Sequence, residues 1–179
     1  MSLNGFRWIK KLIKSKEYAL YRPLTPKTGV QVPVGLPLLA YVGRSSMNER
    51  LQKVIEHPFH KYLGVTTIES NSGAGKLSIA VNEKTVNPRG VLHGGVIYVL
   101  CDVCVYGGLL SLIDNKTEAV THDIQVSVMQ SAKIGDVVDF SSEIVHLGKR
   151  LCFIDVKAFV KGKIIASAKV TKSVLSMLT

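Results

Sequence analysis

The sequence is poor in cysteine, and this shortage excludes two classes of protein. Three cysteines in 179 residues are too few for the disulfide framework of a small secreted domain. Cys101 and Cys104 spell a C-x-x-C motif, but a structural zinc site needs four ligands, and no second pair of similar spacing accompanies them. We therefore predict no metal, no cofactor and no redox function, with the cysteines serving as small core residues in a reducing compartment.

Acidic residues are also scarce, at 13 against 23 Lys or Arg, for a net charge of +10. Most of the excess lies in residues 1–46, which hold eight basic residues and a single acid, Glu17. We predict that residues 1–46 form a basic N-terminal extension, ending in a proline-containing linker, and that residues 47–179 form one domain.

The start of the extension lacks the long apolar stretch of a secretory signal, so we predict that the protein is not secreted. Its apolar side chains alternate with basic ones, as in a basic amphipathic helix. A mitochondrial targeting segment, a membrane-surface anchor and a solvated helix packed on its own domain all remain open. The expected location is mitochondrial or cytoplasmic. The apolar residues are Phe6, Trp8, Ile9, Leu12 and Ile13.

Positive charge also raises the alternative of a nucleic-acid-binding protein, because a basic segment can contact phosphates without sequence specificity. No helix-turn-helix, zinc-finger or aromatic strand motif accompanies the basic segment. We expect no nucleic-acid partner.

One long apolar run, Val96–Ile113, is interrupted only by Asp102 and Ser111. A lipid-facing helix would not readily carry an uncompensated acid near its middle together with the Gly107-Gly108 pair, because an acid at mid-bilayer costs about 2.5–3.5 kcal/mol. The run therefore predicts a helix that is apolar on all sides because protein surrounds it.

The remaining chain has the alternation and the β-branched residues of strands. Glycines separate four such segments after the helix: Lys116–Val126, Asp136–His146, Leu151–Val160 and Lys163–Leu175. Before the helix, Tyr62–Ser70 and Lys76–Val81 flank the hairpin signal of residues 71–75. We predict an α+β fold in which about six antiparallel strands wrap around one long central helix.

The start of the predicted helix is suited to chemistry. Gly94 and Gly95 open it, and their backbone N–H groups can point at an oxygen that gains negative charge. Asp102 follows Gly94 by eight residues, about 12 Å along the axis. If both act on one carbonyl, the acid must come from a second, antiparallel copy, as in a two-fold dimer. The alternative is a structural acid satisfied by a lysine or a backbone group, beside a simple tight turn.

These residues belong to a larger pattern. The run Asn87-Pro88-Arg89-Gly90-Val91-Leu92-His93-Gly94-Gly95, with Asp102 nine residues after His93 and Thr121-His122-Asp123-Ile124 opening a strand, resembles the PaaI-like branch of the hotdog-fold acyl-CoA thioesterases. The resemblance covers about residues 47–175. It implies a hotdog fold, hydrolysis of an acyl-CoA thioester to free acid and CoA, a role in lipid metabolism, and a homodimer or homotetramer. Also similar are His57-Pro58-Phe59, Gly64 and Gly148-Lys149-Arg150.

The resemblance implies a role for each residue of the site. The Gly94 N–H would polarise the thioester carbonyl, and Asp102 of the partner subunit would be the nucleophile or the general base. Asn87 would help to place the carbonyl or the water, and His93 would hold the loop and the helix start. Thr121 would orient the water. Asn87 could instead form only an Asx turn, and Thr121 could be an ordinary strand residue.

Four further residues are predicted to contact the substrate. Gly95 adds a second helix-start N–H, and His122 beside Thr121 lines the site. Lys149 and Arg150 lie at a turn where they could meet the phosphates of coenzyme A or belong to a solvated loop. A non-catalytic acyl-CoA-binding protein stays open as the alternative function. An enoyl-CoA hydratase fits less well, because the predicted helix has no histidine after Asp102.

Overall fold

The structure is a computed structural model, and it describes residues 49–176. The predicted extension, residues 1–46, lies outside the described residues. Residues 49–56 are helical. The elements that follow are α3 (Pro58–Tyr62), β1 (Glu69–Asn71), β2 (Ala74–Ala80), α4 (Gly94–Leu109), β3 (Thr117–Val128), β4 (Val137–Leu147), β5 (Leu151–Val160) and β6 (Lys163–Ser176).

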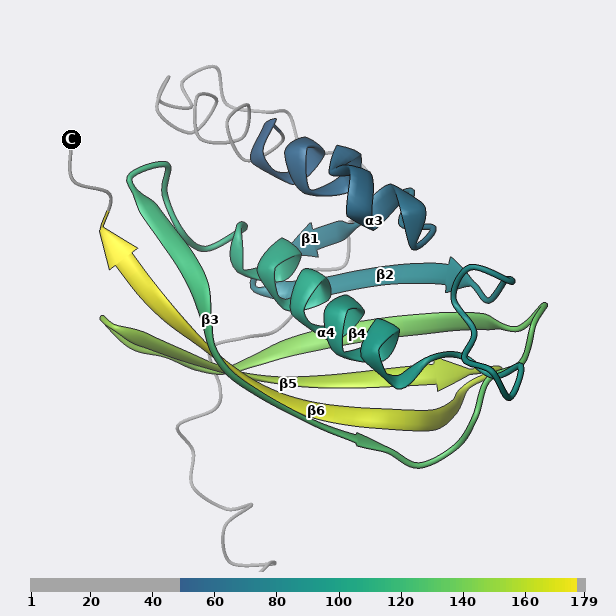
Figure 1. Cartoon of the computed structure of the whole chain (residues 1–179). Helices are drawn as coiled ribbons and strands as arrows, with labels where there is room; N and C mark the ends of the chain where they lie inside the picture. The colour runs from purple at the N-terminus through teal and green to yellow at the C-terminus, as the bar shows by residue number, and fades with distance from the viewer. Residues whose placement is uncertain (1–48, 177–179) are drawn as a thin grey trace, which may run out of the picture. The chain divides into compact units, whose positions relative to one another are not determined.

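The six strands form one antiparallel sheet in the order β1-β2-β4-β5-β6-β3. The sheet curves around α4, which lies across its concave side (Figure 1). The predicted α+β architecture, an antiparallel sheet wrapped around one long helix, is confirmed. We call the side of the sheet that faces α4 its inner face and the opposite side its outer face.

The strands after α4 match their predicted ranges to within two residues at each end, but the first predicted strand is wrong. Tyr62 ends the helix α3 instead of starting a strand, since Pro58 at the first helical turn has the backbone angle that a helix needs. The hairpin itself is confirmed. Its two turn residues, Ser72 and Gly73, have φ of 49° and 85°, as expected for a tight turn between twisted strands.

Helix α4 ends at Leu109, four residues before the end of the apolar run. Its C-terminal half packs directly on the backbone of β2. A Cβ atom on Gly75 would lie 2.1 Å from the carbonyl oxygen of Cys104, and one on Gly108 would lie 2.5 Å from the amide nitrogen of Gly75. The small residues of the apolar run therefore let the helix approach the sheet closely.

The core lies between α4 and the inner face of the sheet. Leu100, Cys104 and Leu109 of the helix are fully buried, as are Phe140 and Ile154 of the strands. The predicted all-round burial of the helix is confirmed over most of its length. Among residues 49–176, no helix combines the length and the apolar character needed to cross a bilayer.

Candidate active site

The start of α4 is held by its own N-cap residue. His93 has an extended backbone, with φ −66° and ψ 130°, and its Nδ1 accepts a hydrogen bond of 2.9 Å from the Gly95 N–H. The His93 N–H donates to the Thr85 carbonyl at 2.9 Å, which ties the loop to the helix. Within residues 49–176, the Gly94 N–H donates to no protein acceptor. Gly94, not Gly95, therefore offers a donor for a ligand.

The loop before α4 is an Asx turn. Oδ1 of Asn87 accepts a hydrogen bond of 2.9 Å from the Arg89 N–H, and the Gly90 N–H donates to the Asn87 carbonyl at the same distance. Gly90 closes the turn with a φ of +75°, a backbone conformation that glycine adopts with little strain and other residues do not. The turn uses Oδ1 of Asn87 and leaves its amide NH₂ without a protein partner among the described residues.

Asp102 lies at the centre of a polar cluster between α4 and the sheet. The Thr121 hydroxyl and the Lys172 ammonium both donate to its Oδ1, each at 2.7 Å. Lys172 also donates to the Thr121 hydroxyl at 2.8 Å. Within residues 49–176 no donor reaches Oδ2, and the Asp102 side chain is 34% exposed. One carboxylate oxygen is thus anchored, while the other can be reached from solvent.

Two neighbouring strands supply the partners of Asp102. Thr121 of β3 and Lys172 of β6 stand opposite each other in the sheet register. Inner-face residues of β6 alternate with outer ones, and Ala168, Val170 and Lys172 are all buried. Lys172 therefore continues an apolar row of the inner face, with only 2% of its side chain exposed.

Sequence reasoning missed Lys172 as a partner of Asp102. It allowed an unnamed lysine to satisfy the acid, but it gave no position. The signal is present, because Lys172 falls on the apolar register of a strand, where an unpaired charge would be costly. The strand pairing that sets it opposite Thr121 is a long-range contact, which the local pattern does not contain.

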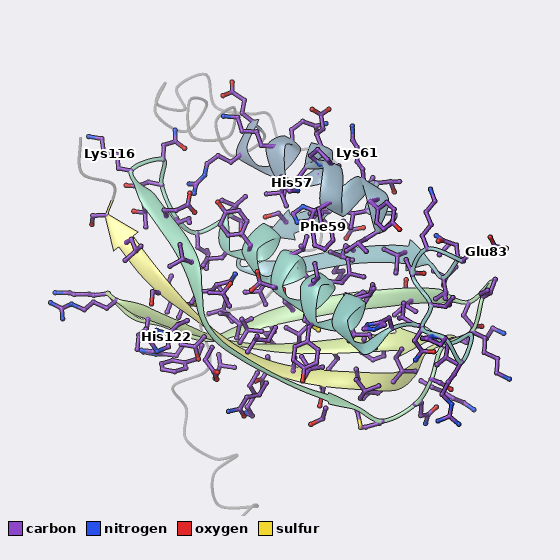
Figure 2. The ribbon with its side chains drawn as sticks, in the orientation of Figure 1. His57, Phe59, Lys61, Glu83, Lys116 and His122 are labelled. Atoms are coloured by element: carbon purple, nitrogen blue, oxygen red, sulfur yellow. The ribbon has the colours of Figure 1, made fainter. Side chains whose placement is uncertain are left out.

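The structure does not bring His122 to Asp102. His122 falls at an irregularity in the pairing of β3 with β6, and its Nδ1 lies 3.3 Å from Oγ of Ser173. Ser173 follows Lys172 and points to the opposite face of the sheet. His122 is therefore on the outer face, away from α4 (Figure 2). Sequence adjacency to Thr121 was misleading because neighbouring strand residues face opposite ways.

Lys149 and Arg150 are exposed in the turn between β4 and β5. This turn lies at the same end of the sheet as Lys172, since Cys152 pairs with Lys172 and the Val174 N–H donates to the Arg150 carbonyl at 2.8 Å. Both side chains are thus near the end of the sheet where the polar cluster lies, and both face solvent.

A second polar cluster lies one helical turn beyond Asp102. The Tyr106 hydroxyl donates to Glu118 at 2.7 Å, and Arg50 reaches the same carboxylate oxygen at 3.1 Å. Burial alone would raise the pKa of Glu118, but the hydrogen bonds from Tyr106 and the Ala119 N–H, together with Arg50, hold it below its ordinary value. The Tyr106 ring lies 5.7 Å from Nζ of Lys172, so the two clusters adjoin.

The C-x-x-C cysteines point into the core. Burial raises the pKa of Cys101 to about 12 and that of Cys104 to about 11. Both thiols therefore remain protonated at neutral pH, whereas thiol chemistry and metal binding require the thiolate. Cys104 instead donates to the Gly75 carbonyl at 3.3 Å. This arrangement fits the predicted role of small core residues.

Comparison with known proteins shows the family. The profile of the Thioesterase superfamily matches residues 89–166. Human acyl-coenzyme A thioesterase 13 is 29% identical over 136 residues, which are 72% of this chain and 96% of that protein. A Bacillus subtilis protein named "Putative esterase ComA2" is 31% identical over 96 residues, or 53% of this chain and 75% of that one. The chain belongs to the thioesterase superfamily, and the predicted identity as a thioester hydrolase is confirmed.

Solved structures agree on the fold. A hypothetical thioesterase protein from Streptococcus pneumoniae with coenzyme A is 25% identical, with a TM-score of 0.56 over 63% of this chain and 88% of that one. A mutant of the protein PaaI from Thermus thermophilus is 21% identical, with a TM-score of 0.59 over 66% of this chain and 97% of that one. The predicted resemblance to PaaI-like hotdog thioesterases is confirmed.

Proposed function

We propose that this protein hydrolyses acyl-CoA thioesters to a free acid and coenzyme A at a site shared by two copies of the chain. Two groups on α4 carry the proposal. The Gly94 N–H at the start of the helix has no protein acceptor within residues 49–176, and the Asp102 carboxylate in the middle of the helix has one accessible oxygen. Relatives named as acyl-coenzyme A thioesterases and a thioesterase structure that includes coenzyme A support the substrate class.

The Gly94 N–H polarises the thioester carbonyl. Attack on this carbonyl places negative charge on its oxygen, and a preorganised donor at a helix start stabilises that charge. In other enzymes the loss of one such donor costs about 2.7–4 kcal/mol. The amide of Asn87, which the Asx turn leaves without a protein partner among the described residues, places the carbonyl or the water.

Oδ2 of the partner subunit's Asp102 supplies the second half of the reaction. As a general base it takes a proton from water while the water oxygen bonds to the carbonyl carbon; as a nucleophile it forms that bond itself and water then cleaves the anhydride. In both cases the carbon–sulfur bond breaks, and coenzyme A leaves with a proton. Thr121 holds the carboxylate by donating to Oδ1, and its hydroxyl oxygen orients the water by accepting a hydrogen bond from it.

Two copies are required because Gly94 and Asp102 of one helix lie about 12 Å apart. Strand β3 is one of the two edge strands of the sheet, so its outer backbone groups are open to a second copy. Large apolar side chains are exposed along this edge and beyond it, as expected for a surface that a second copy covers. They are Val120, Val128, Met129 and Ile134, each between 45% and 55% exposed. A homodimer satisfies the site, and a homotetramer would pair two such dimers.

We also propose a role in substrate binding for two exposed basic residues and a role in localisation for the N-terminal segment. Lys149 and Arg150 suit the phosphates of coenzyme A, because they are exposed at the end of the sheet where the polar cluster lies.

Residues 1–46, with their basic and apolar pattern, direct the protein to the mitochondrion or hold it at a membrane surface in the cytoplasm. Imaging a fluorescent protein fused to residues 1–46 tests this assignment.

Hydrolysis of an acyl-CoA panel, from acetyl through long-chain and aryl groups, tests the activity. We expect free coenzyme A from at least one thioester, and a loss of at least about a thousandfold in kcat for Asp102→Asn, because the variant lacks the base or nucleophile. Asn is preferred to Ala because it still accepts hydrogen bonds from Thr121 and Lys172. A folded wild-type protein that binds the thioesters but turns over none would instead favour the alternative, a non-catalytic acyl-CoA-binding protein.

Mixing two inactive variants tests the shared site. Gly94→Pro removes the N–H at the first helical position, where proline fits, and the extended His93 before it suits a proline. A Cβ on Gly94 would meet nothing within 4 Å. Co-assembled with Asp102→Asn, the variant is expected to recover about one quarter of wild-type activity, because half of the dimers carry one intact site. If no activity is recovered, Gly94 and Asp102 of one site come from the same subunit.

A further inference from the structure

We propose that Lys172 is a positioning residue of the active site, which anchors Oδ1 of Asp102 and thereby directs Oδ2 at the reacting centre. The inference rests on the proposed hydrolysis, because it concerns the same carboxylate. It assigns a function to a buried lysine on β6 that neither the sequence motif nor the helix start includes.

The hydrogen bonds around Lys172 have a fixed direction. An ammonium only donates, so the 2.8 Å bond to Thr121 makes that hydroxyl an acceptor, and the hydroxyl's single proton goes to Asp102. Lys172 itself donates a second bond to the same oxygen of Asp102 at 2.7 Å. Two donors thus converge on Oδ1, and the carboxylate cannot rotate without breaking both. The reactive oxygen is selected by this geometry.

Burial makes the lysine more than a surface counter-ion. The Lys172 side chain is 2% exposed, whereas that of Asp102 is 34% exposed. A buried ammonium retains its charge only with compensation from neighbouring groups, and the carboxylate of Asp102 supplies it. In turn the ammonium places a positive charge 2.7 Å from Oδ1 of the Asp102 carboxylate. Thr121 alone, being neutral, could not do this.

Among residues 49–176, Asp102 is the only acidic residue in contact with Lys172. From α4, the Tyr106 ring lies 5.7 Å from Nζ, and burial raises the pKa of this phenol, so it is neutral at pH 7. From β5, burial raises the pKa of Cys152, which is likewise neutral. The carboxylate of Glu118 on β3 lies beyond Tyr106 and is paired with Arg50.

The dependence of kcat on pH tests the inference, with an acyl-CoA that the wild-type protein hydrolyses. In Lys172→Met the length of the side chain is retained and the charge is lost. We expect kcat at pH 7 to fall at least about tenfold, because Oδ1 loses one of its two donors, and the acid limb of the profile to move to higher pH, because the positive charge beside the carboxylate is lost. Lys169→Met is the matched control, because Lys169 lies on the same strand with its side chain 80% exposed, and it should leave both unchanged.

Rescue separates a charge effect from a packing effect. In Lys172→Ala, added ethylammonium or propylammonium is expected to restore part of kcat, whereas propanol at the same concentration is not. A non-additive loss is also expected: in an Asp102→Asn background, Lys172→Met should remove little further activity, because the group that it positions is already disabled.

The outcomes discriminate between the two proposals. A wild-type protein inactive on every acyl-CoA overturns the proposed function and this inference with it. An active wild type beside a folded Lys172→Met with an unchanged profile, or rescue by propanol as strong as by the amines, overturns this inference alone. If the Met and Ala variants do not fold, Lys172→Arg tests the inference instead. Arginine retains the positive charge, so the acid limb of the kcat profile should stay where it is in the wild-type protein. An acid limb displaced upward in Lys172→Arg overturns the inference.

Discussion

Two lysines three residues apart on β6 illustrate the difference between the two faces of the sheet. Lys172 on the inner face is 2% exposed and lies 2.7 Å from Asp102, whereas Lys169 on the outer face is 80% exposed and lies 3.6 Å from Asp155. Both are Lys–Asp pairs by composition. Water screens the outer pair, so it contributes little, while the inner pair is held between helix and sheet, where charge and geometry are strongly coupled.

The contrast extends to the rest of the sheet. Between the inner face and α4 lie the core, the three buried cysteines and the polar cluster around Asp102. The outer face carries mostly polar and charged side chains, among them Gln125, Asp155 and Lys169. A polar residue on the inner face therefore needs a specific partner or a function, whereas the same residue on the outer face needs neither.

Replacing glycine by alanine on the inner face should have the largest effect on stability. Gly75→Ala would place a Cβ atom 2.1 Å from the Cys104 carbonyl oxygen. Because this oxygen belongs to the backbone of α4, the helix must shift, and we expect the free energy of unfolding to fall by about 3 kcal/mol or more. Urea denaturation measures the loss. Lys76→Ala on the outward-facing neighbour should change it by less than about 0.5 kcal/mol, and equal losses for the two variants would contradict the comparison.

The two Lys–Asp pairs should give the next largest difference in the free energy of unfolding. Lys172→Met should lower the free energy of unfolding by about 2 kcal/mol. This is less than the roughly 3–5 kcal/mol typical of breaking a buried pair, because a third of the Asp102 side chain stays in solvent. Lys169→Met should cost less than about 0.5 kcal/mol, and raising the salt concentration should erase even that. Denaturation curves at low and high salt measure both, and a salt-sensitive loss in Lys172→Met would argue against its burial.

Much of this fold could be predicted from sequence because its local signals are strong. The apolar run around Asp102 specified a buried helix, and the alternation in the last four strands located each to within two residues. The helix α3 was missed because Pro58–Tyr62 is only five residues long, too short for helical periodicity to stand out. Short elements depend on their neighbours more than on their own pattern.

One part of the candidate site could be predicted from local sequence, and the other part could not. The helix start is a local feature, so Gly94 and His93 could be located from the motif alone, and His93 does cap the helix. The surroundings of Asp102 depend on strand pairing. Only the register that sets Thr121 against Lys172 identifies the lysine and turns His122 to the outer face. A single sequence shows which residues alternate, but it does not show which strands are neighbours.

The smallest expected effect concerns the two buried thiols of α4 and the pH dependence of stability. Burial raises the pKa of Cys101 to about 12 and that of Cys104 to about 11, while both ionise near the ordinary thiol value of 9.0 in the unfolded chain. Between these values the folded state binds more protons than the unfolded state, so stability is full below pH 9 and falls as the pH rises through and above it.

At pH 9 half of each unfolded thiol has ionised, and the loss is about 0.4 kcal/mol per thiol. Urea denaturation at pH 8 and pH 9 should resolve this difference in the wild-type protein, and Cys101→Ala with Cys104→Ala should remove most of it. Thiols on the outer face would titrate alike in both states and give no such slope. An identical slope in wild type and double variant would therefore mean that these cysteines reach solvent, and that the close approach of α4 to the inner face is looser than the contact of Gly75 with Gly108 implies.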